Sequence, residues 1–530
     1  MDLFKQRKQT SKRSSSSAQS QGGGGSPKHP LLTSLRDNLQ RIKDALGSSE
    51  DLIIRQFRIG KEGKIQAAIC YMDGLTDTKS IQNFIMGSLM QEMRLTDLEQ
   101  ITDTDPDVLQ LIKDYALSVG DLKEAADFET LFNSLLSGNA ILLLEGHMQS
   151  LVIGISEWED RAVAEPSSQT VIRGPRDGFT ETLRTNTSLL RRKIKDPNLW
   201  LESRKIGRVT KTDVAMMYIK GIASDKIVQE VRSRLDRIDI DGILESGYIE
   251  ELIQDETRTP FPTLYNTERP DVVAAGLLEG RVAILVDGTP FVLLAPVIFA
   301  QFYQSPEDYY QRADAGTLIR FLRYLSLFIA LLGPSLYIAI TTFHQEMLPT
   351  PLLISLAAQR EGVPFPAFIE ALMMEVTFEI LREAGVRMPR AVGQAISIVG
   401  ALVIGQAAVE AGIVSAAMVI VVSITAISSF VFPSFNMAIS IRMLRFFLMG
   451  LAASFGLFGI TVGLIALVLH LCSLRSFGVP YMSPFAPFIA ADQKDAVFRF
   501  PQWALFARPR LISQKNVIRE QNSPTPKPDN

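Results

Sequence analysis

The fold class is decided at residues 324–343, which read YLSLFIALLGPSLYIAITTF and contain no Asp, Glu, Lys or Arg. A helix of this length crosses about 30 Å of hydrocarbon, the thickness of a membrane core. Further charge-free runs follow at 391–409, 411–441 and 446–474. We do not expect the core helices of a soluble protein to form such a succession. The sequence therefore predicts an all-α, multi-span transmembrane domain.

This domain extends over residues 301–475, with four to five spans. Four of the spans follow from their lack of charge, whereas the fifth carries several glutamates and stays open. The expected spans are 324–343, 391–409, 413–435 and 446–472, with 364–383 undecided, and residues 476–530 form a C-terminal segment and tail.

The orientation of the domain follows from the basic residues beside the spans. Arg312, Arg320 and Arg323 precede the first span, and positive residues next to spans face the cytoplasm. We therefore expect a cytoplasmic N-terminal region. The side of the C-terminus stays open. If 364–383 crosses the membrane, five arginines at its end and beyond lie inside and the tail after Leu474 lies outside. If it does not cross, the tail lies inside and these arginines lie outside. These arginines are Arg382, Arg387, Arg390, Arg442 and Arg445.

Residues 31–300 mix short β-rich runs with helical periodicity, which is typical of α/β layers. We divide them into two cytoplasmic α/β sub-domains, 31–156 and 205–300, joined by a connecting segment at 157–204. Residues 1–30 are rich in Ser and Gly and predict a disordered tail. The expected strands are 51–59, 65–72, 139–146, 150–156, 205–220 and 279–294, and the expected helices are 31–46, 78–93, 107–117 and 224–238, the last with Ser224 as its N-cap.

Composition argues against several classes of function. The chain has 530 residues and a formal net charge of −3, without the domain-wide basic excess that nucleic-acid binding favours. Its two cysteines and four histidines show no metal-ligand spacing, and we find no nucleotide-binding or hydrolase motif. We therefore expect no enzyme activity, no cofactor, no metal site and no nucleic-acid partner.

A basic turn stands in the connecting segment. Residues 171–194 read VIRGPRDGFTETLRTNTSLLRRKI, in which Gly-Pro and Asp-Gly are turn signals ahead of a helix. Arg173 and Arg176 project from this turn, Thr180 is a possible N-cap and Glu181 suits the first helical turn. The turn is either an anion site or partner contact, or a structural turn with its own ion pairs. The candidate coupling or assembly residues are Arg173, Arg176, Asp177 and Glu181.

Four separated motifs carry a resemblance to a known family. RGPRDGF (173–179) is followed by SPEDYY (305–310), PFP (364–366) and VFPSFNMAISIRMLRF (431–446). In this order and spacing, the chain resembles the A subunits of GerA-type spore germinant receptors from about residue 31 to 510.

The resemblance implies a place in the inner membrane of the bacterial spore, with the N-terminal region facing the spore core. It implies a transporter-like B subunit that binds the nutrient, a lipoprotein C subunit, and further copies of the chain in a ring, expected to be a pentamer. Such a ring, set in membrane lipid, forms a nutrient-gated channel for monovalent cations that triggers germination. The alternative is a transporter-like or scaffold subunit that relays germinant binding without conducting ions. The family also includes a paralogue encoded with the dipicolinate channel genes.

The undecided span carries acids in an apolar setting. At 100° per residue, Glu375, Glu379 and Glu383 share one stripe, whereas Glu370 lies opposite Glu379. Acids at membrane depth persist where they face water, a partner or an ion path, and a ring of them attracts cations. The alternative is an amphipathic helix on the membrane surface. The candidate pore or ion-path residues are Glu370, Glu375, Glu379, Glu383, Gln394, Gln406 and Glu410.

Small residues recur in the last charge-free run. Ala452, Gly456, Gly459 and Gly463 form two pairs with a spacing of four, which lets helices approach closely. We assign these four residues to helix packing.

Overall fold

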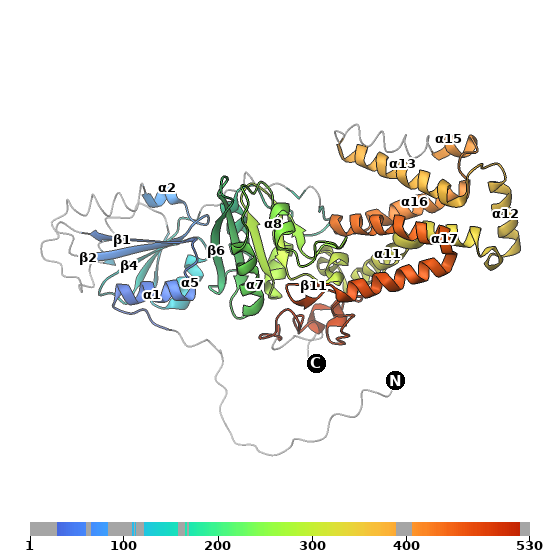
Figure 1. Cartoon of the computed structure of the whole chain (residues 1–530). Helices are drawn as coiled ribbons and strands as arrows, with labels where there is room; N and C mark the ends of the chain where they lie inside the picture. Colours follow the sequence, from blue (N-terminus) through green and yellow to red (C-terminus); the bar gives the residue numbers. More distant parts are fainter. Residues whose placement is uncertain are drawn as a thin grey trace, which may run out of the picture.

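The computed structural model describes residues 29–59, 65–82, 109, 110, 112, 121–156, 165, 166, 169–387 and 405–519. Two sheet-containing units, blue and green in Figure 1, and a bundle of long helices follow one another along an elongated molecule. Several predicted segments lie wholly or largely outside the described residues: the tail at 1–30, the helices at 78–93 and 107–117, and the span at 391–409.

Within its described residues, the first unit contains five strands and three short helices: α1 (Leu35–Ala45), β1 (Leu52–Ile59), β2 (Ile65–Met72), α2 (Thr78–Ser80), β3 (Leu122–Ala125), α5 (Phe128–Leu135), β4 (Ala140–Leu144) and β5 (Ser150–Ile153). The strands form an antiparallel sheet in the order β1-β2-β4-β5-β3. Successive side chains of a strand face opposite sides of a sheet. Ala68 and Cys70 therefore pack with α1 and α5, while Ala67 and Ile69 face a second core.

The second unit repeats this topology. It contains α6 (Leu183–Lys193), β6 (Leu199–Ile206), β7 (Thr212–Ile219), α7 (Asp225–Asp236), α8 (Ser246–Ile253), β8 (Tyr265–Thr267), α9 (Pro270–Leu278), β9 (Val282–Val286) and β10 (Val292–Ala295). Its strand order, β6-β7-β9-β10-β8, is that of the first sheet with every number raised by five. In both units a helix precedes the first strand and another separates the third from the fourth. The repeat was not predicted from the sequence.

The predicted boundaries need correction in places. Four predicted strands of the first unit are confirmed within a few residues, those at 51–59, 65–72, 139–146 and 150–156. The connecting segment expected at 157–204 ends earlier, because β6 begins at Leu199 and α6 packs into the core of the second unit. The predicted second sub-domain was therefore too short. The sequence of α6 shows that it forms a helix, but it does not show against which sheet the helix packs.

The predicted N-cap of α6 is also wrong. Thr182, not Thr180, occupies the N-cap position, so Glu181 precedes the helix. The buried Thr180 exchanges hydrogen bonds with Asn186 instead: its amide donates to Oδ1 at 2.7 Å, and Nδ2 donates to the Thr180 carbonyl at 2.6 Å. Ser224 does stand at the N-cap of α7, although its side chain makes no capping hydrogen bond.

The helical region begins after a 3-10 turn, η3 (Phe299–Tyr303). It contains α10 (Glu307–Tyr310), α11 (Ala313–Thr342), η4 (Gln345–Met347), α12 (Thr350–Arg360), α13 (Ala367–Arg387), α15 (Gly405–Glu410), α16 (Ala416–Phe430) and α17 (Phe435–Ser473). Among the described helices, α11 and α17 are long and apolar enough to cross a membrane. The helix that contains the span predicted at 446–472, α17, starts earlier, at Phe435, and includes Arg442 and Arg445.

The helix α17 reverses direction at Gly456, whose φ of 60° and ψ of −140° are not helical. Glycine adopts such angles far more readily than other residues. The second half returns along the first, since a Cβ added to Gly463 would lie 2.7 Å from the Leu448 side chain. The predicted single span is therefore a hairpin of two helices.

The helix ends near the second unit are identified by their contacts. The ring of Phe432, between α16 and α17, meets Tyr303 edge-on with centroids 5.9 Å apart. His470, near the end of α17, has its Nε2 2.9 Å from Thr259 Oγ1. Gly456 lies at the far end, beside Phe343.

The C-terminal segment folds back onto the second unit. It contains β11 (Arg475–Ser476), β12 (Val479–Pro480), η6 (Asp492–Asp495) and η7 (Gln502–Ala504). The Ser476 hydroxyl donates to the Thr263 carbonyl at 2.7 Å, and Ser513 Oγ donates to the Ile222 carbonyl at 2.9 Å. The second unit and the C-terminal segment therefore lie at the same end of the helices (Figure 1).

Candidate functional site

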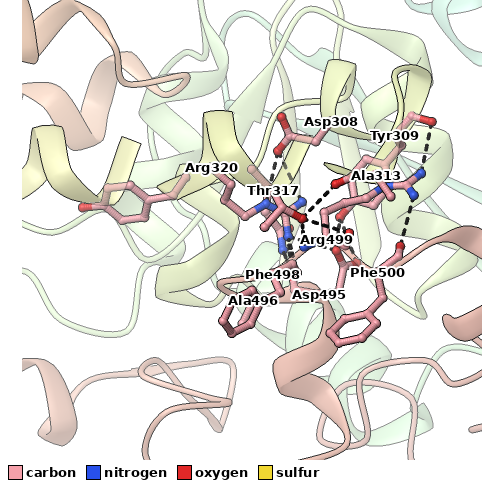
Figure 2. A network of polar contacts seen from close by, with 12 residues as sticks. Asp308, Tyr309, Ala313, Thr317, Arg320, Asp495, Ala496, Phe498, Arg499 and Phe500 are labelled. Atoms are coloured by element: carbon pink, nitrogen blue, oxygen red, sulfur yellow. Dashed lines mark hydrogen bonds and ion pairs between the residues drawn. The ribbon is translucent and has the colours of Figure 1, made fainter. Parts of the chain in front are cut away.

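A buried polar network joins α10, the first turns of α11 and the C-terminal segment (Figure 2). We call it the junction network. Asp308 of α10 accepts hydrogen bonds from Arg323 Nη1 at 2.8 Å and from Arg320 Nη2 at 3.2 Å. Arg320 also reaches Asp495 of η6, with Nη1 3.0 Å from Oδ1. The side chains of Arg320 and Asp308 are 0% and 1% exposed, so these charges are removed from water.

Aromatic and basic side chains close the network from the other side. The Tyr309 hydroxyl donates to the Asp495 carboxylate at 2.9 Å. Burial, reinforced by the negative charge of Asp495, raises the pKa of Tyr309 well above its usual range, so the hydroxyl remains a donor. Burial also raises the pKa of Asp495, an effect that the Arg320 guanidinium opposes. The Arg499 guanidinium lies over the Tyr309 ring, 5.6 Å from its centroid.

The basic turn of the connecting segment packs against residues 307–310 of the SPEDYY motif, next to Asp308 of the junction network. The Glu307 carboxylate accepts the backbone N–H groups of Ile172 and Arg173. Gly174 has a φ of 148°, and a Cβ there would lie 2.7 Å from the Tyr310 ring, so only glycine fits. The turn therefore contacts the helical region at α10, residues 307–310.

A second arm of contacts holds the turn to α9. The Tyr310 hydroxyl donates to Asp271 at 2.6 Å, and Asp271 pairs with the buried Arg269 at 2.8 Å. Arg269 Nη2 in turn donates to the Pro175 carbonyl at 3.0 Å. Burial and hydrogen bonding to Asp271 raise the pKa of Tyr310, which keeps the hydroxyl protonated.

This arrangement suits mechanical coupling between the second unit and α11 rather than catalysis of a reaction. Removing one partner from a buried ion pair costs about 3–5 kcal/mol, because the other charge is left without compensation. The turn and α9 are thus joined to α10, and α10 to α11, by contacts that are costly to break. In the described part of the chain, no three His, Cys, Asp or Glu side chains gather as a metal site would require.

The predicted coupling residues lie at the edge of this network. The side chains of Arg173 and Arg176 are exposed, and Arg176 approaches Glu165 only at 3.8 Å. Asp177 pairs with Lys193 at 2.8 Å, and Glu181 accepts the Gly288 N–H through its backbone carbonyl. The turn therefore contacts its neighbours mainly through backbone groups and Gly174.

The residues that form the network were not singled out from the sequence. Two signals pointed to them: the acids and tyrosines of SPEDYY, and the spacing of Arg320 and Arg323, which puts both on one helix face. Asp495 had no such signal, since it is 175 residues from Arg320 along the chain.

The acids of α13 face α17 and α16. Glu375 pairs with Arg445, both side chains being at most 1% exposed, and Glu379 pairs with Arg442 at 2.7 Å. Glu370 accepts the Ser415 N–H at 2.6 Å from the N-cap of α16. One oxygen each of Glu375 and Glu379 is buried without a hydrogen-bond partner among the described residues. An ion-path role for these acids stays a prediction.

The remaining candidates are dispersed. Glu383 pairs with Arg387 at 2.6 Å, and Gln406 donates to Glu410 at 2.8 Å, both on exposed surfaces. Gln394 lies outside the described residues. The four small residues of α17 lie at its reversal or between its halves and their neighbours: Ala452 and Gly456, Gly459 and Gly463, all buried.

Comparison with known proteins finds relatives that match most of the chain. Residues 40–511 match the family model described as "Bacillus/Clostridium GerA spore germination protein". Spore germination protein KA of Bacillus subtilis (strain 168) is 54% identical over 495 residues, covering 93% of this chain and 90% of that protein. Spore germination protein GerLA of Bacillus cereus is 40% identical over 483 residues, covering 91% of this chain and 96% of that protein.

Two further relatives differ in kind. An uncharacterized membrane protein of Bacillus subtilis (strain 168), YfkQ, is 48% identical over 487 residues, covering 92% of this chain and 93% of that protein. Among solved structures, the chain is similar to the N-terminal domain of the A subunit of the Bacillus megaterium spore germinant receptor GerK3. That match has 46% identity and a TM-score of 0.42, covering 52% of this chain and 99% of that domain.

Proposed function

The chain belongs to the GerA family of Bacillus and Clostridium spore germination proteins, and on this premise we propose that it is the A subunit of a nutrient-gated cation channel. In this proposal the chain works in the inner membrane of the spore with a B and a C subunit. Several copies form a ring, expected to be a pentamer, around a path for monovalent cations.

The helical region supports a membrane location. Two of its described helices are long and apolar enough to cross a bilayer, and large apolar side chains such as Phe328, Phe447 and Phe458 are exposed on them. Arg442 and Arg445 lie in the half of α17 that starts beside the second unit. We therefore place this end, with both sheet units, on the cytoplasmic side, facing the spore core.

The paired acids of α13 can line an ion path once they are separated from their arginine partners. Glu375 and Glu379 each keep one buried oxygen free of described hydrogen-bond partners, which a hydrated cation would satisfy. Their arginine partners on α17 neutralise them in the present arrangement. In the proposed channel, separating α13 from α17 exposes the carboxylates to the path.

The junction network supplies the coupling. A change in the sheet units, or in a partner bound to them, moves the turn and α9, and the buried contacts of Asp308 pass this movement to α11. This network is the single observation that carries the proposal, because its buried charges join α10 to α11, and the Tyr310–Asp271 hydrogen bond joins α10 to the second unit.

The same ion pairs favour a second candidate. If Arg442 and Arg445 keep the acids paired in every state, the chain is a scaffold or transporter-like relay that passes germinant binding to other spore membrane proteins without conducting ions.

Conductance decides between the two. The reconstituted receptor is recorded with Glu370, Glu375, Glu379 and Glu383 each replaced by Gln. We expect lower cation selectivity or conductance for Glu375→Gln and Glu379→Gln, because each removes a negative charge from the path. Glu251→Gln, exposed on α8 of the second unit, is the comparison variant. Unchanged conductance and selectivity at all four sites would favour the relay.

A further inference from the structure

The C-terminal segment exposes large aromatic side chains. They lie between residues 488 and 506, and each is 41% to 74% exposed: Phe488, Phe498, Phe500, Trp503 and Phe506. Water-exposed apolar clusters of this kind mark a surface that binds something, because a soluble surface gains nothing from them.

Hydrogen bonds hold this segment beside the first turns of α11. Thr317 Oγ1 donates to the Arg499 carbonyl at 3.1 Å, and the Tyr324 hydroxyl donates to the Ala496 carbonyl at 3.3 Å. Arg320 Nη1 reaches the Phe498 carbonyl at 3.3 Å (Figure 2). The level of the aromatic side chains relative to the helices is therefore fixed.

The helix α11 exposes apolar side chains at the same level. Leu318, Phe321 and Leu322 are 62%, 58% and 46% exposed in its first turns. With its 30 residues, α11 is about 45 Å long at 1.5 Å per residue. That length exceeds the hydrocarbon core by about 15 Å, so its first turns reach beyond the core.

The charge of the segment adds a second argument. Residues 476–519 contain six basic residues against Asp492 and Asp495. Arg499 and Arg508 are buried, whereas Arg510 and Lys515 are exposed and Lys494 and Arg519 are half-buried. Lys494 Nζ stands 4.5 Å from the centre of the exposed Phe506 ring. Aromatic rings next to basic residues are the composition of a membrane–water interface.

We propose that residues 488–506 and the first turns of α11 form a lipid-binding collar. The collar lies in the headgroup layer on the side of the second unit, with its aromatic rings at the top of the acyl chains and its basic groups among anionic headgroups. The inference rests on the membrane location proposed above. A second copy of the chain is the competing occupant of this surface.

Fluorescence quenching of Trp503 in the full chain tests the collar. The protein is placed in nanodiscs with lipids brominated either near the headgroup or near the chain ends, and the signal of Trp503→Phe is subtracted from that of the wild type. We expect the difference signal to lose intensity mainly with shallow bromines, and more so when anionic lipid is included. A difference signal that neither lipid quenches would overturn the collar.

A tryptophan near the middle of the first half of α17 separates this test from that of the membrane location. Phe447→Trp, made together with Trp503→Phe, is expected to be quenched by deep bromines, since Phe447 is 61% exposed on α17. Deep quenching at position 447 without quenching of Trp503 refutes the collar and leaves the spans in place. Quenching at neither position refutes both. If Trp503 is quenched only after oligomers are dissociated, a second copy covers the surface and the lipid proposal is wrong.

Discussion

At the scale of single residues, Asp308 carries the largest share of the junction network. It is the carboxylate that both Arg320 and Arg323 contact, and its side chain is 1% exposed. We expect Asp308→Asn to lower the free energy of unfolding by about 3–5 kcal/mol, because the buried Arg323 loses its counter-charge and Arg320 keeps only that of Asp495. Thermal unfolding of the purified protein in detergent measures this change.

The chain offers a matched control for this substitution. Asp314, in the first turn of α11, pairs with Arg312 at 2.9 Å in solvent. Asp314→Asn should leave the unfolding temperature unchanged, since exposed ion pairs contribute little. Equal effects of the two substitutions would show that burial of the network carries no energetic weight.

The residue scale also shows what the sequence can and cannot predict. The arginines before the first span were identified from their position beside it, as markers of orientation, since positive residues flank spans. The side chain of Arg320 is 0% exposed, and one of its partners in this buried site is Asp495, from a distant part of the chain. Likewise, the stripe of α13 acids was predicted from periodicity, whereas its arginine partners on α17 were not.

At the scale of elements, the reversal of α17 depends on Gly456. A Cβ at this position would lie 2.8 Å from His344 Cε1, and the φ of 60° is unfavourable for alanine. We expect Gly456→Ala to destabilise the protein by about 1–3 kcal/mol, through backbone strain and the contact with α11. Gly450→Ala is the control, because that site is open and helical. There, alanine should stabilise by about 0.5–1 kcal/mol. Similar unfolding temperatures for the two variants would argue against the hairpin.

Hydropathy could not reveal this reversal. Residues 446–474 contain no Asp, Glu, Lys or Arg and are largely apolar, and such a run has the same average hydropathy whether its helix continues or turns back. The glycines of this run were assigned to packing against another helix. The structure places Gly459 and Gly463 against Leu451 and Leu448 of the same α17. The information lies in one pair of backbone angles, which composition does not encode.

At the scale of the whole molecule, the hairpin removes a conflict that the sequence left open. With α17 counted as one span, the C-terminal tail and the arginines after residue 364 could not both lie inside. The C-terminal segment bonds to the second unit through Ser476 and Ser513, so the two share one side of the helices. The two sheet units were predicted as sub-domains, but their shared topology was not, because equal strand order does not require recognisable sequence similarity.

This arrangement predicts an even number of membrane crossings between the second unit and the C-terminal segment. Single cysteines at Leu244, Met347 and Gln514, all exposed, are placed in a Cys472→Ala background and labelled with a membrane-impermeant maleimide in sealed vesicles. Cys70 can stay, because burial raises the pKa of its thiol to about 12 and keeps it unreactive. Leu244→Cys and Gln514→Cys should label on the same side and Met347→Cys, after α11, on the other. Labelling of Gln514→Cys together with Met347→Cys would mean that the C-terminal segment crosses the membrane, and the contacts of Ser476 and Ser513 with the second unit could not exist in the inserted protein.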